Sequence, residues 1–174
     1  MKQIWEFKGK HSFLSNFFEV EFIMDGEVCL SGEHAFQAAK TLDFKEREHI
    51  LLSTTPGISK RRGRSVELRS DWECIKVPIM AKVLHTKFKL PEMERKLIST
   101  GDALLVEGNA WGDAFWGFDL KRGFGQNMLG RLLMMLRKSK RNESYAERYK
   151  KIADSNWFKK IYEGHSLGEI IDIE

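Results

Sequence analysis

Residues 19–40 read EVEFIMDGEVCLSGEHAFQAAK, and this stretch decides the fold. Polar and apolar residues alternate over Glu19-Val20-Glu21-Phe22, the pair Asp25-Gly26 follows, and Val28 and Leu30 come after it. An Asp-Gly pair between two alternating runs predicts a tight β-hairpin, because both turn positions need a positive φ. Ser31 then follows as the N-cap of a helix that we expect over residues 32–43. The sequence therefore predicts a hairpin that leads directly into a helix.

The helix expected over residues 32–43 has two different faces. On one side of this helix, Glu33, Gln37 and Lys40 lie within about 60° of one another. A carboxylate, an amide and an amine in one row can form a site, whereas this spacing alone favours a solvated helix face. The apolar face, which we expect to join the core, has the spacing i, i+3, i+4, i+7 and consists of Ala35, Ala38, Ala39 and Leu42.

The remaining sequence predicts a helix-rich α+β domain with a small antiparallel sheet. We expect Pro78 in the first turn of its helix, where a proline is tolerated. A second helix is expected to end before Pro56, and KRRGR at residues 60–64 is expected to be a basic turn. The further helices are predicted over 45–53, 78–89, 92–99, 126–138 and 142–163, and the further strands at 4–7 and 104–106.

Length and composition exclude several classes of protein. The 174 residues favour one domain, which at this size buries a core without disulfides. Cys29 and Cys74 form no C-x-x-C pair, so a disulfide scaffold and a zinc ribbon are excluded. Free thiols fit a reducing cytosol, and we see neither a membrane-length apolar run nor a signal peptide, so we expect a cytoplasmic protein. The five histidines have no metal-binding spacing, and we expect no metal.

The basic charge of the chain is concentrated near its C-terminus. Residues 137–151 hold seven basic and two acidic residues, a net of +5, whereas the other 22 basic and 23 acidic residues give −1. Tyr145, Tyr149 and Trp157 are interleaved with these charges, which would suit contact with nucleic acid. The alternatives are a solvated helix face and aromatic residues that dock the tail onto the core. If the tail binds nucleic acid, truncation after Ser139 should spare a small substrate and weaken action on DNA.

Two segments combine large aromatic residues with polar ones, which is unusual for free loops. Residues 12–18 read SFLSNFF, and residues 111–117 read WGDAFWG. The second segment can build a wall for a flat ring together with a carboxylate, or it can be a packed aromatic corner. The run Gly123-Phe124-Gly125 precedes a predicted helix, where backbone amides would suit an anion, although a plain tight turn is the alternative.

Several blocks of residues follow one another in a specific order and spacing along residues 5–138. They include Phe13-Leu14-Ser15-Asn16-Phe17, Ser31-x-Glu33-His34-x-Phe36-Gln37-x-x-Lys40, Lys60-Arg61-x-Gly63-Arg64, Asp71-Trp72, Lys87-Phe88, Leu105-Val106-Glu107, Asp113-x-x-Trp116-Gly117 and Gly125-x-Asn127-x-Leu129-Gly130-Arg131. Together these blocks resemble the NADAR (YbiA-like) family of N-glycosidases. The tail after Lys140 lies outside the resemblance, so we expect a NADAR-like domain over 1–140 and a basic helical tail over 141–174, packed on it or extending from it.

The resemblance implies hydrolysis of an N-glycosidic bond to a ribose 5-phosphate unit, without a metal or organic cofactor. Two substrate classes are implied: ribosylaminopyrimidine phosphates of riboflavin biosynthesis, and ADP-ribose attached to guanine in DNA. The alternative is a non-catalytic module that binds ADP-ribose or nucleic acid.

The candidate catalytic residues are Glu33, Asp113 and Lys40. Cleavage of a C1′–N bond creates positive charge on the ribose, which a carboxylate stabilises, and the departing nitrogen needs a proton from an acid. An amine desolvated beside other cations is nucleophilic, so Lys40 can attack a ring-opened C1′ and form a Schiff base, a route that the resemblance also implies. The alternative role for Lys40 is to bind phosphate or ribose.

The candidate substrate-binding residues are three cations, three side chains with an amide group and three aromatic residues. The cations and the amides before Asn127 are candidates for phosphate, and the aromatic residues are candidates for stacking on the base. The alternatives are a solvated basic turn for the cations and core packing for the aromatic residues. The full set is Asn16, Phe17, Gln37, Lys60, Arg61, Arg64, Trp72, Trp116 and Asn127.

Overall fold

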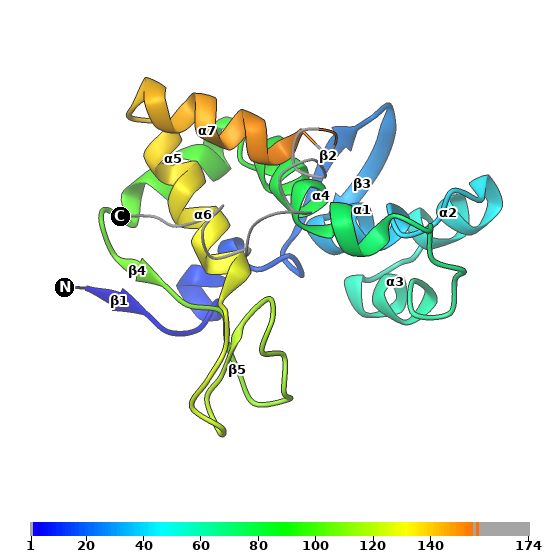
Figure 1. Cartoon of the computed structure of the whole chain (residues 1–174), viewed down its shortest axis with the longest axis horizontal. Coiled ribbons are helices and arrows are strands. Elements are labelled where there is room, and N and C mark those ends of the chain that lie inside the picture. Colours follow the sequence, from blue (N-terminus) through cyan, green and yellow to red (C-terminus); the bar gives the residue numbers. More distant parts are fainter. Residues whose placement is uncertain (1, 155, 157–174) are drawn as a thin grey trace.

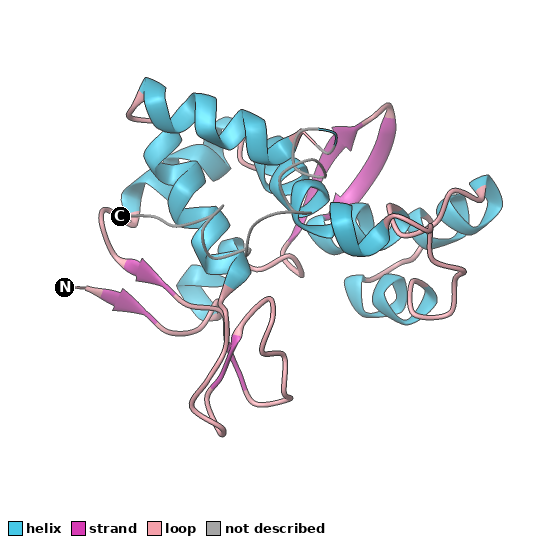
Figure 2. Cartoon of the chain, viewed as in Figure 1, coloured by secondary structure: helices cyan, strands magenta, loops and turns pink. Residues whose placement is uncertain are grey.

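The computed structural model describes residues 2–154 and residue 156. Helices pack around a core at the centre, and a loop-rich lobe projects from one end (Figures 1 and 2). We refer to residues 107–125 as the lobe. The helices α4 (Trp72–Lys87) and α6 (Met128–Ser139) form the centre, and α5 (Pro91–Ser99) and α7 (Glu143–Ala153) lie at the end opposite to the lobe.

The hairpin predicted from Asp25-Gly26 is confirmed. The strands β2 (Glu19–Met24) and β3 (Glu27–Ser31) pair antiparallel, and the turn residues have positive φ values of 55° and 83°. The Ser31 side chain accepts a hydrogen bond from the backbone N–H of His34, as expected of an N-cap. A hairpin and a cap that share one residue fix where the next helix begins.

That helix, α1 (Gly32–Ala38), is shorter than the predicted range of 32–43. Asp43 caps a separate helix, α2 (Phe44–Leu51), by accepting a hydrogen bond from Glu46 N. The capping side chain therefore divides the predicted helix, and Leu42 falls in the connection, where it is 71% exposed. The other three members of the predicted apolar face are buried as expected.

Of the two predictions about prolines, one is confirmed and one is wrong. The helix predicted over 45–53 is α2, which ends before Pro56 as expected. Pro56 begins a further helix that was not predicted, α3 (Pro56–Arg62), at a first-turn position behind the N-cap Thr55. The basic residues predicted in a turn thus end a helix. Pro78 lies inside α4 because that helix starts six residues before it, at Trp72. The helix is buried on nearly every side there, and its packing against α1, α6 and α7 outweighs the local cost of a proline.

The α+β class is confirmed, but the strands form three separate pairs in the part of the chain that the structure describes. Besides the hairpin, β1 (Gln3–Ile4) pairs parallel with β4 (Leu104–Leu105), and β5 (Gly108–Asn109) pairs parallel with β6 (Phe118–Asp119). A two-residue strand is too short to show alternation, so the sequence did not indicate these parallel pairs.

The helix α7 packs against α4 and α6 rather than extending from them (Figure 1). The Tyr149 side chain is 2% exposed, its hydroxyl donates to the carbonyl of Ala81 at 2.8 Å, and Ile152 is fully buried. The proposed stacking of Tyr149 on nucleic acid is therefore wrong, and docking of the tail onto the core is correct for α7. Trp157 and the end of the predicted helix lie outside the described residues. No helix within the described ranges is long and apolar enough to span a membrane.

Candidate active site

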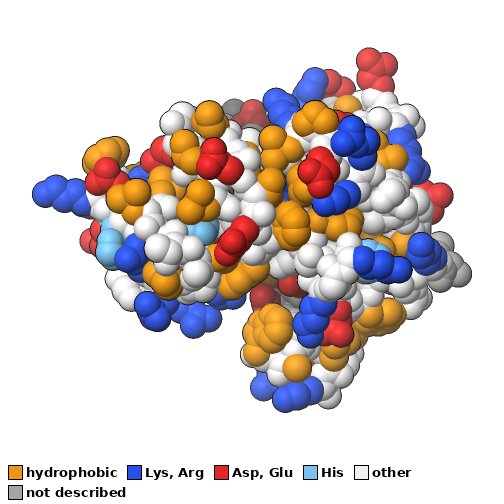
Figure 3. All heavy atoms as spheres, turned by 180° about the vertical axis from the view of Figure 1, so that it is seen from behind, with side chains coloured by type: hydrophobic (Ala, Val, Ile, Leu, Met, Phe, Trp, Pro, Cys, Tyr) orange, Lys and Arg blue, Asp and Glu red, His pale blue; other side chains and the backbone are white. Residues whose placement is uncertain are grey.

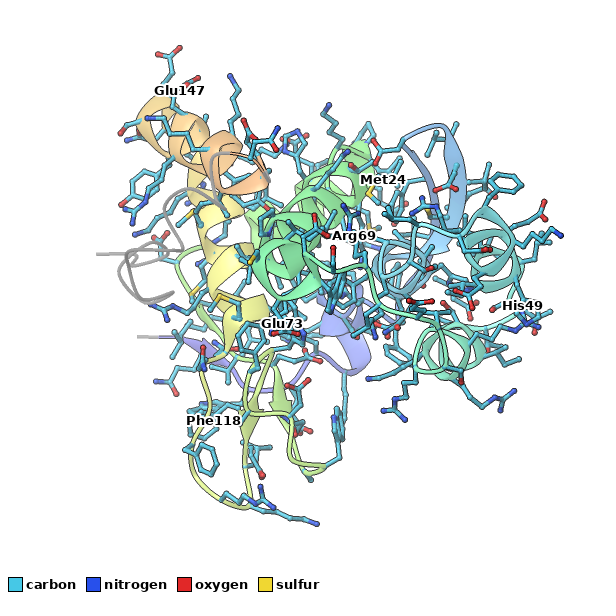
Figure 4. All side chains as sticks on the ribbon, turned by 45° about the vertical axis from the view of Figure 1, so that its right-hand side comes forward. Met24, His49, Arg69, Glu73, Phe118 and Glu147 are labelled. Carbon is cyan, nitrogen blue, oxygen red and sulfur yellow. The ribbon has the colours of Figure 1, made fainter. Side chains whose placement is uncertain are left out.

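A cavity of about 850 Å³ lies between the lobe and the part of the chain that holds α1 and α3. In the space-filling view from behind, the surface is indented between the lobe and the α2–α3 side of the molecule (Figure 3). Figure 4 shows these two parts from another side, with Phe118 in the lobe and His49 in α2. Nine of the predicted site residues line the cavity: Asn16, Phe17, Glu33, Gln37, Lys40, Lys60, Arg64, Asp113 and Trp116.

The two members of the predicted row that lie on α1 are buried, so the interpretation as a solvated helix face is wrong for them. Lys40 follows just after the end of α1 and is partly buried. Glu33 and Gln37 are 5% and 3% exposed, and the Nε2 atom of Gln37 donates to Oε1 of Glu33 at 2.8 Å. The loop that contains Asn16 covers the start of the helix, because the backbone carbonyl of Asn16 accepts a hydrogen bond from Glu33 N at 2.9 Å. The aromatic-polar segment at residues 12–18 therefore forms one side of the cavity.

Burial changes the protonation of the two ionisable groups on this row. It raises the pKa of Glu33 above its ordinary value, and the nearby cations Lys60, Lys40 and Arg64 oppose that rise. It also lowers the pKa of Lys40, which Glu33 opposes and the other two cations reinforce. The Lys40 Nζ atom donates to the carbonyl of Gly63 at 3.3 Å. A carboxyl and an amine that both exchange protons more readily near neutral pH thus share one wall.

Asp113 organises the opposite wall while facing the cavity. Its Oδ1 atom accepts hydrogen bonds from the backbone N–H groups of Phe115 at 3.2 Å and Trp116 at 2.9 Å. The Trp116 ring packs edge-on against Phe36, with centroids 5.3 Å apart. The segment WGDAFWG is consequently both a packed corner and a cavity wall. Trp111, at its start, is 66% exposed on the rim.

Two charged residues near the cavity, one buried and one partly buried, were not among the predicted site residues. Burial and the Asp113 carboxylate raise the pKa of Glu107, which lines the cavity, to about 7. Burial lowers the pKa of Lys87, which is fully buried at the end of α4, to about 7. The available signal was a charged residue directly beside apolar ones in the pairs Lys87-Phe88 and Val106-Glu107.

Three predicted binding residues do not line the cavity. Arg61 is exposed on α3, and Trp72 is 6% exposed and packs on Phe36, so it offers no face for stacking. Asn127 instead joins two backbone segments: its Oδ1 atom accepts from Glu107 N at 2.9 Å, and its Nδ2 atom donates to the carbonyl of Leu105 at 2.8 Å. Asn127 therefore supports the backbone beside the cavity without lining the cavity itself.

The amides at the start of α6 do not form an anion site either. The backbone N–H groups of residues 126–129 donate to the carbonyls of residues 114–117, at distances of 2.7 to 3.1 Å. Donors that are already bonded are not available to a phosphate. These four amides are therefore not available to a phosphate, and their bonds fasten the inner wall of the lobe to the helix.

Residues 4–141 match the family model of the NADAR domain. This chain belongs to the NADAR family. The NADAR match covers the cavity and all of the helices up to α6, and it ends just before α7.

Relatives of this NADAR protein carry enzyme names. The N-glycosidase YbiA of Escherichia coli is 43% identical over 126 residues, which are 71% of this chain and 78% of the relative. An N-glycosidase of Nostoc punctiforme is 37% identical over 63% of this chain and 73% of its own length. A riboflavin biosynthesis protein of Vibrio vulnificus is 36% identical over 73% of this chain but only 35% of its own length. These relatives confirm the expected enzyme class of the NADAR protein, a hydrolase that acts on N-glycosyl bonds.

The fold of the NADAR protein is also similar to a solved structure. The NMR structure of the Escherichia coli protein YbiA superimposes with a TM-score of 0.72 at 38% identity, over 83% of this chain and 89% of that one. Within the described residues, no group of three or more His, Cys, Asp or Glu side chains is placed to hold a metal ion.

Proposed function

We propose that this protein hydrolyses the N-glycosidic bond between a phosphorylated ribose and a base, with the reaction centre in the cavity between α1 and the lobe. The observation that carries the proposal is the convergence of Glu33, Lys40 and Asp113 on one cavity of about 850 Å³. The three come from segments about 70 residues apart, and their chemistry matches the needs of this bond. A volume in this range accommodates a small phosphorylated molecule.

The two walls of the cavity supply different groups to the reaction. Asp113, on the lobe, supplies the negative charge that stabilises a positively charged ribose as the C1′–N bond breaks. Glu33, on α1, exchanges protons with the water and the amine on its own wall, a role that suits a carboxyl with a raised pKa. The hydrogen bond from Gln37 holds the Glu33 carboxyl in place.

Lys40 is the candidate nucleophile. Burial lowers the pKa of its amine, so a larger fraction is neutral and able to attack the ring-opened C1′. Attack forms a Schiff base and releases the base, and water then hydrolyses the Schiff base and returns the lysine. Reduction with cyanoborohydride during turnover should attach the ribose phosphate to Lys40, and peptide mass spectrometry should locate it. A Lys40→Met variant should give no adduct.

The remaining cavity residues suit the two ends of such a substrate. Lys60 and Arg64 place two cations at the α3 side, where they can bind a phosphate. The Lys60 Nζ atom lies 5.2 Å from the centroid of the Phe17 ring, which is 42% exposed. Phe17 and Trp116 offer aromatic surface to a base.

We propose a ribosylaminopyrimidine phosphate as the substrate class, which the names of the riboflavin biosynthesis relatives support. ADP-ribosylated guanine in DNA is the second candidate, because the exposed Trp111 on the rim could contact a larger substrate. A cytoplasmic location stays an expectation.

A side-by-side assay tests the proposal. The protein, with EDTA present, is incubated with a ribosylaminopyrimidine 5-phosphate and with DNA that carries ADP-ribosylated guanine, and release of ribose phosphate or ADP-ribose is measured. Release from the first substrate supports the proposal, and release from the second alone transfers it to modified DNA. Binding without release from either would favour a non-catalytic module.

A further inference from the structure

Glu107 occupies a position that the backbone fixes closely. Its N–H donates to Oδ1 of Asn127 at 2.9 Å, and its carbonyl accepts from Phe118 N at 2.9 Å. A Cβ atom on Gly117 would lie 2.3 Å from that carbonyl oxygen, so no larger residue fits there without a backbone shift. The neighbouring backbone therefore holds Glu107 at the cavity, and its carboxyl has no part in holding it.

Among the three carboxyls of the cavity, Glu107 is the one with a buried oxygen, Oε2, that has no hydrogen-bond partner among the described residues. Glu33 accepts a hydrogen bond from Gln37, and Asp113 accepts two from backbone amides. A buried polar atom without a partner is costly, and such atoms in native proteins commonly serve a ligand or a reaction.

The charges around Glu107 favour its neutral form. Burial is the largest cause, and the carboxylates of Asp113 and Glu33 add to it. The cations Lys60 and Lys87 face the same group and oppose them. The balance raises the pKa of Glu107 to about 7, so a substantial fraction carries a proton at neutral pH.

We propose that Glu107 is a further catalytic residue, whose protonated carboxyl gives its proton to the departing nitrogen of the base. This inference rests on the proposed function. As the C1′–N bond breaks, its electron pair stays on nitrogen, the O–H bond of Glu107 breaks, and the proton moves to that nitrogen. Water then hydrolyses the Schiff base on Lys40 and supplies the oxygen at C1′, and the Glu107 carboxylate takes up the proton that this hydrolysis releases. One water is consumed, and no oxidant or reductant is needed.

The first test varies how much the leaving group needs a proton. The substrates are 5-phosphoribosyl anilines with ring substituents, from aniline to nitroaniline, and the proteins are the wild type and Glu107→Gln. Nitroaniline leaves with little protonation, whereas aniline depends on it. We expect Glu107→Gln to lose about 10²- to 10³-fold in kcat/KM on aniline and about tenfold or less on nitroaniline. Glu48→Gln, the same change at an exposed position on α2, should match the wild type.

The pattern across the anilines distinguishes an acid from a structural residue. An equal loss on every aniline would overturn the inference, because a distorted cavity does not discriminate between leaving groups. If the wild type releases no ribose phosphate from any aniline or from the ribosylaminopyrimidine, the proposed function itself fails. The two failures therefore give different results.

A second measurement uses the wild type and does not depend on how the variant folds. The leaving-group dependence is measured at about pH 6, where Glu107 holds its proton, and at about pH 8.5, where it has lost it. We expect a weak dependence at the lower pH and a steep one at the higher pH. The same slope at both would contradict a role for Glu107 as the acid.

Discussion

The lobe and α7 both combine aromatic side chains with charged ones, yet only the lobe faces the cavity. Trp111 in the lobe is 66% exposed, whereas Tyr149 in α7 is 2% exposed and bonded to the core. The difference lies in spacing: Tyr145, Tyr149 and Ile152 recur at i, i+4, i+7, which is the pattern of a buried helix face. The lobe has no such period, so its aromatic residues can remain at the surface.

The largest expected effect comes from removing α7. Truncation after Ser139 deletes Tyr149 and Ile152 and exposes the apolar faces of α4 and α6 against which they pack. We expect the truncated protein to lose cooperative unfolding, and with it activity on every substrate. Circular dichroism with heating provides the measurement. A truncated protein that unfolds as the wild type does would show that α7 is dispensable for the core.

In contrast to removal of α7, a substitution in the cavity should change the rate of the reaction and not the stability of the fold. Glu33→Gln keeps the size of the side chain but removes its charge and its ability to exchange a proton, so kcat should fall by about 10²-fold or more. Glu48→Gln on the exposed face of α2 is the matched control and should keep the wild-type rate. Wild-type turnover by Glu33→Gln with an unchanged melting temperature would place the site elsewhere.

Two substitutions of Asp113 distinguish the effect of its charge from its structural role. Asp113→Asn retains an oxygen that can accept from the amides of Phe115 and Trp116, whereas Asp113→Ala does not. We expect Asp113→Asn to fold normally and to lose about 10²-fold in kcat/KM through the missing charge. Asp113→Ala should in addition lower the melting temperature. Equal rates for Asp113→Asn and the wild type would limit Asp113 to shaping the lobe.

The pH dependence of stability should report the burial of Lys87. Its pKa is about 7 in the folded protein and about 10.4 in the unfolded chain, so between these values the unfolded chain binds more protons. The free energy of unfolding from this group should therefore rise with pH, by about 2 kcal/mol from pH 7 to 9. Urea unfolding at both pH values measures it, and Lys87→Met should abolish the rise. An identical slope in Lys87→Met would assign it to other groups.

The smallest expected effect concerns the charge on α7. Lys150 and Lys151 lie in its last turn, and no residue of α7 lines the cavity. Changing both to Gln should leave kcat/KM for a small phosphorylated substrate within about twofold of the wild type. A steeper salt dependence for modified DNA in the wild type than in this double variant would show that α7 contacts nucleic acid.

Local signals in the sequence predicted much of the fold. The Asp25-Gly26 turn, the Ser31 cap and the helix predicted over 126–138 depend on local sequence, and each is confirmed. Pairing between strands that are far apart in the sequence leaves no such signal, which is why the parallel pairing of β1 with β4 was missed. The same reason explains Asn127, because its contacts are with residues 105 and 107, about 20 positions away.

The candidate site was predictable as a set of residues but not as an arrangement. The row of Glu33, Gln37 and Lys40 follows from helical spacing, yet that spacing does not show that a loop covers it. Glu107 was missed because its importance depends mainly on burial of its carboxyl, which arises only in the folded chain. Roles that arise from desolvation are not visible in the order of residues.

The bonds between the lobe and α6 determine which wall of the cavity can move. Four successive amides at the start of α6 hold residues 114–117, so a displacement of the inner lobe breaks several hydrogen bonds together. The opposite wall carries Lys60 and Arg64 near the end of α3, which packs mainly on α1 and α2. Widening of the entrance therefore costs least at the wall that holds the phosphate-binding cations. We therefore expect the lobe to be the fixed wall of the cavity and the α2–α3 side to adjust to the size of the substrate.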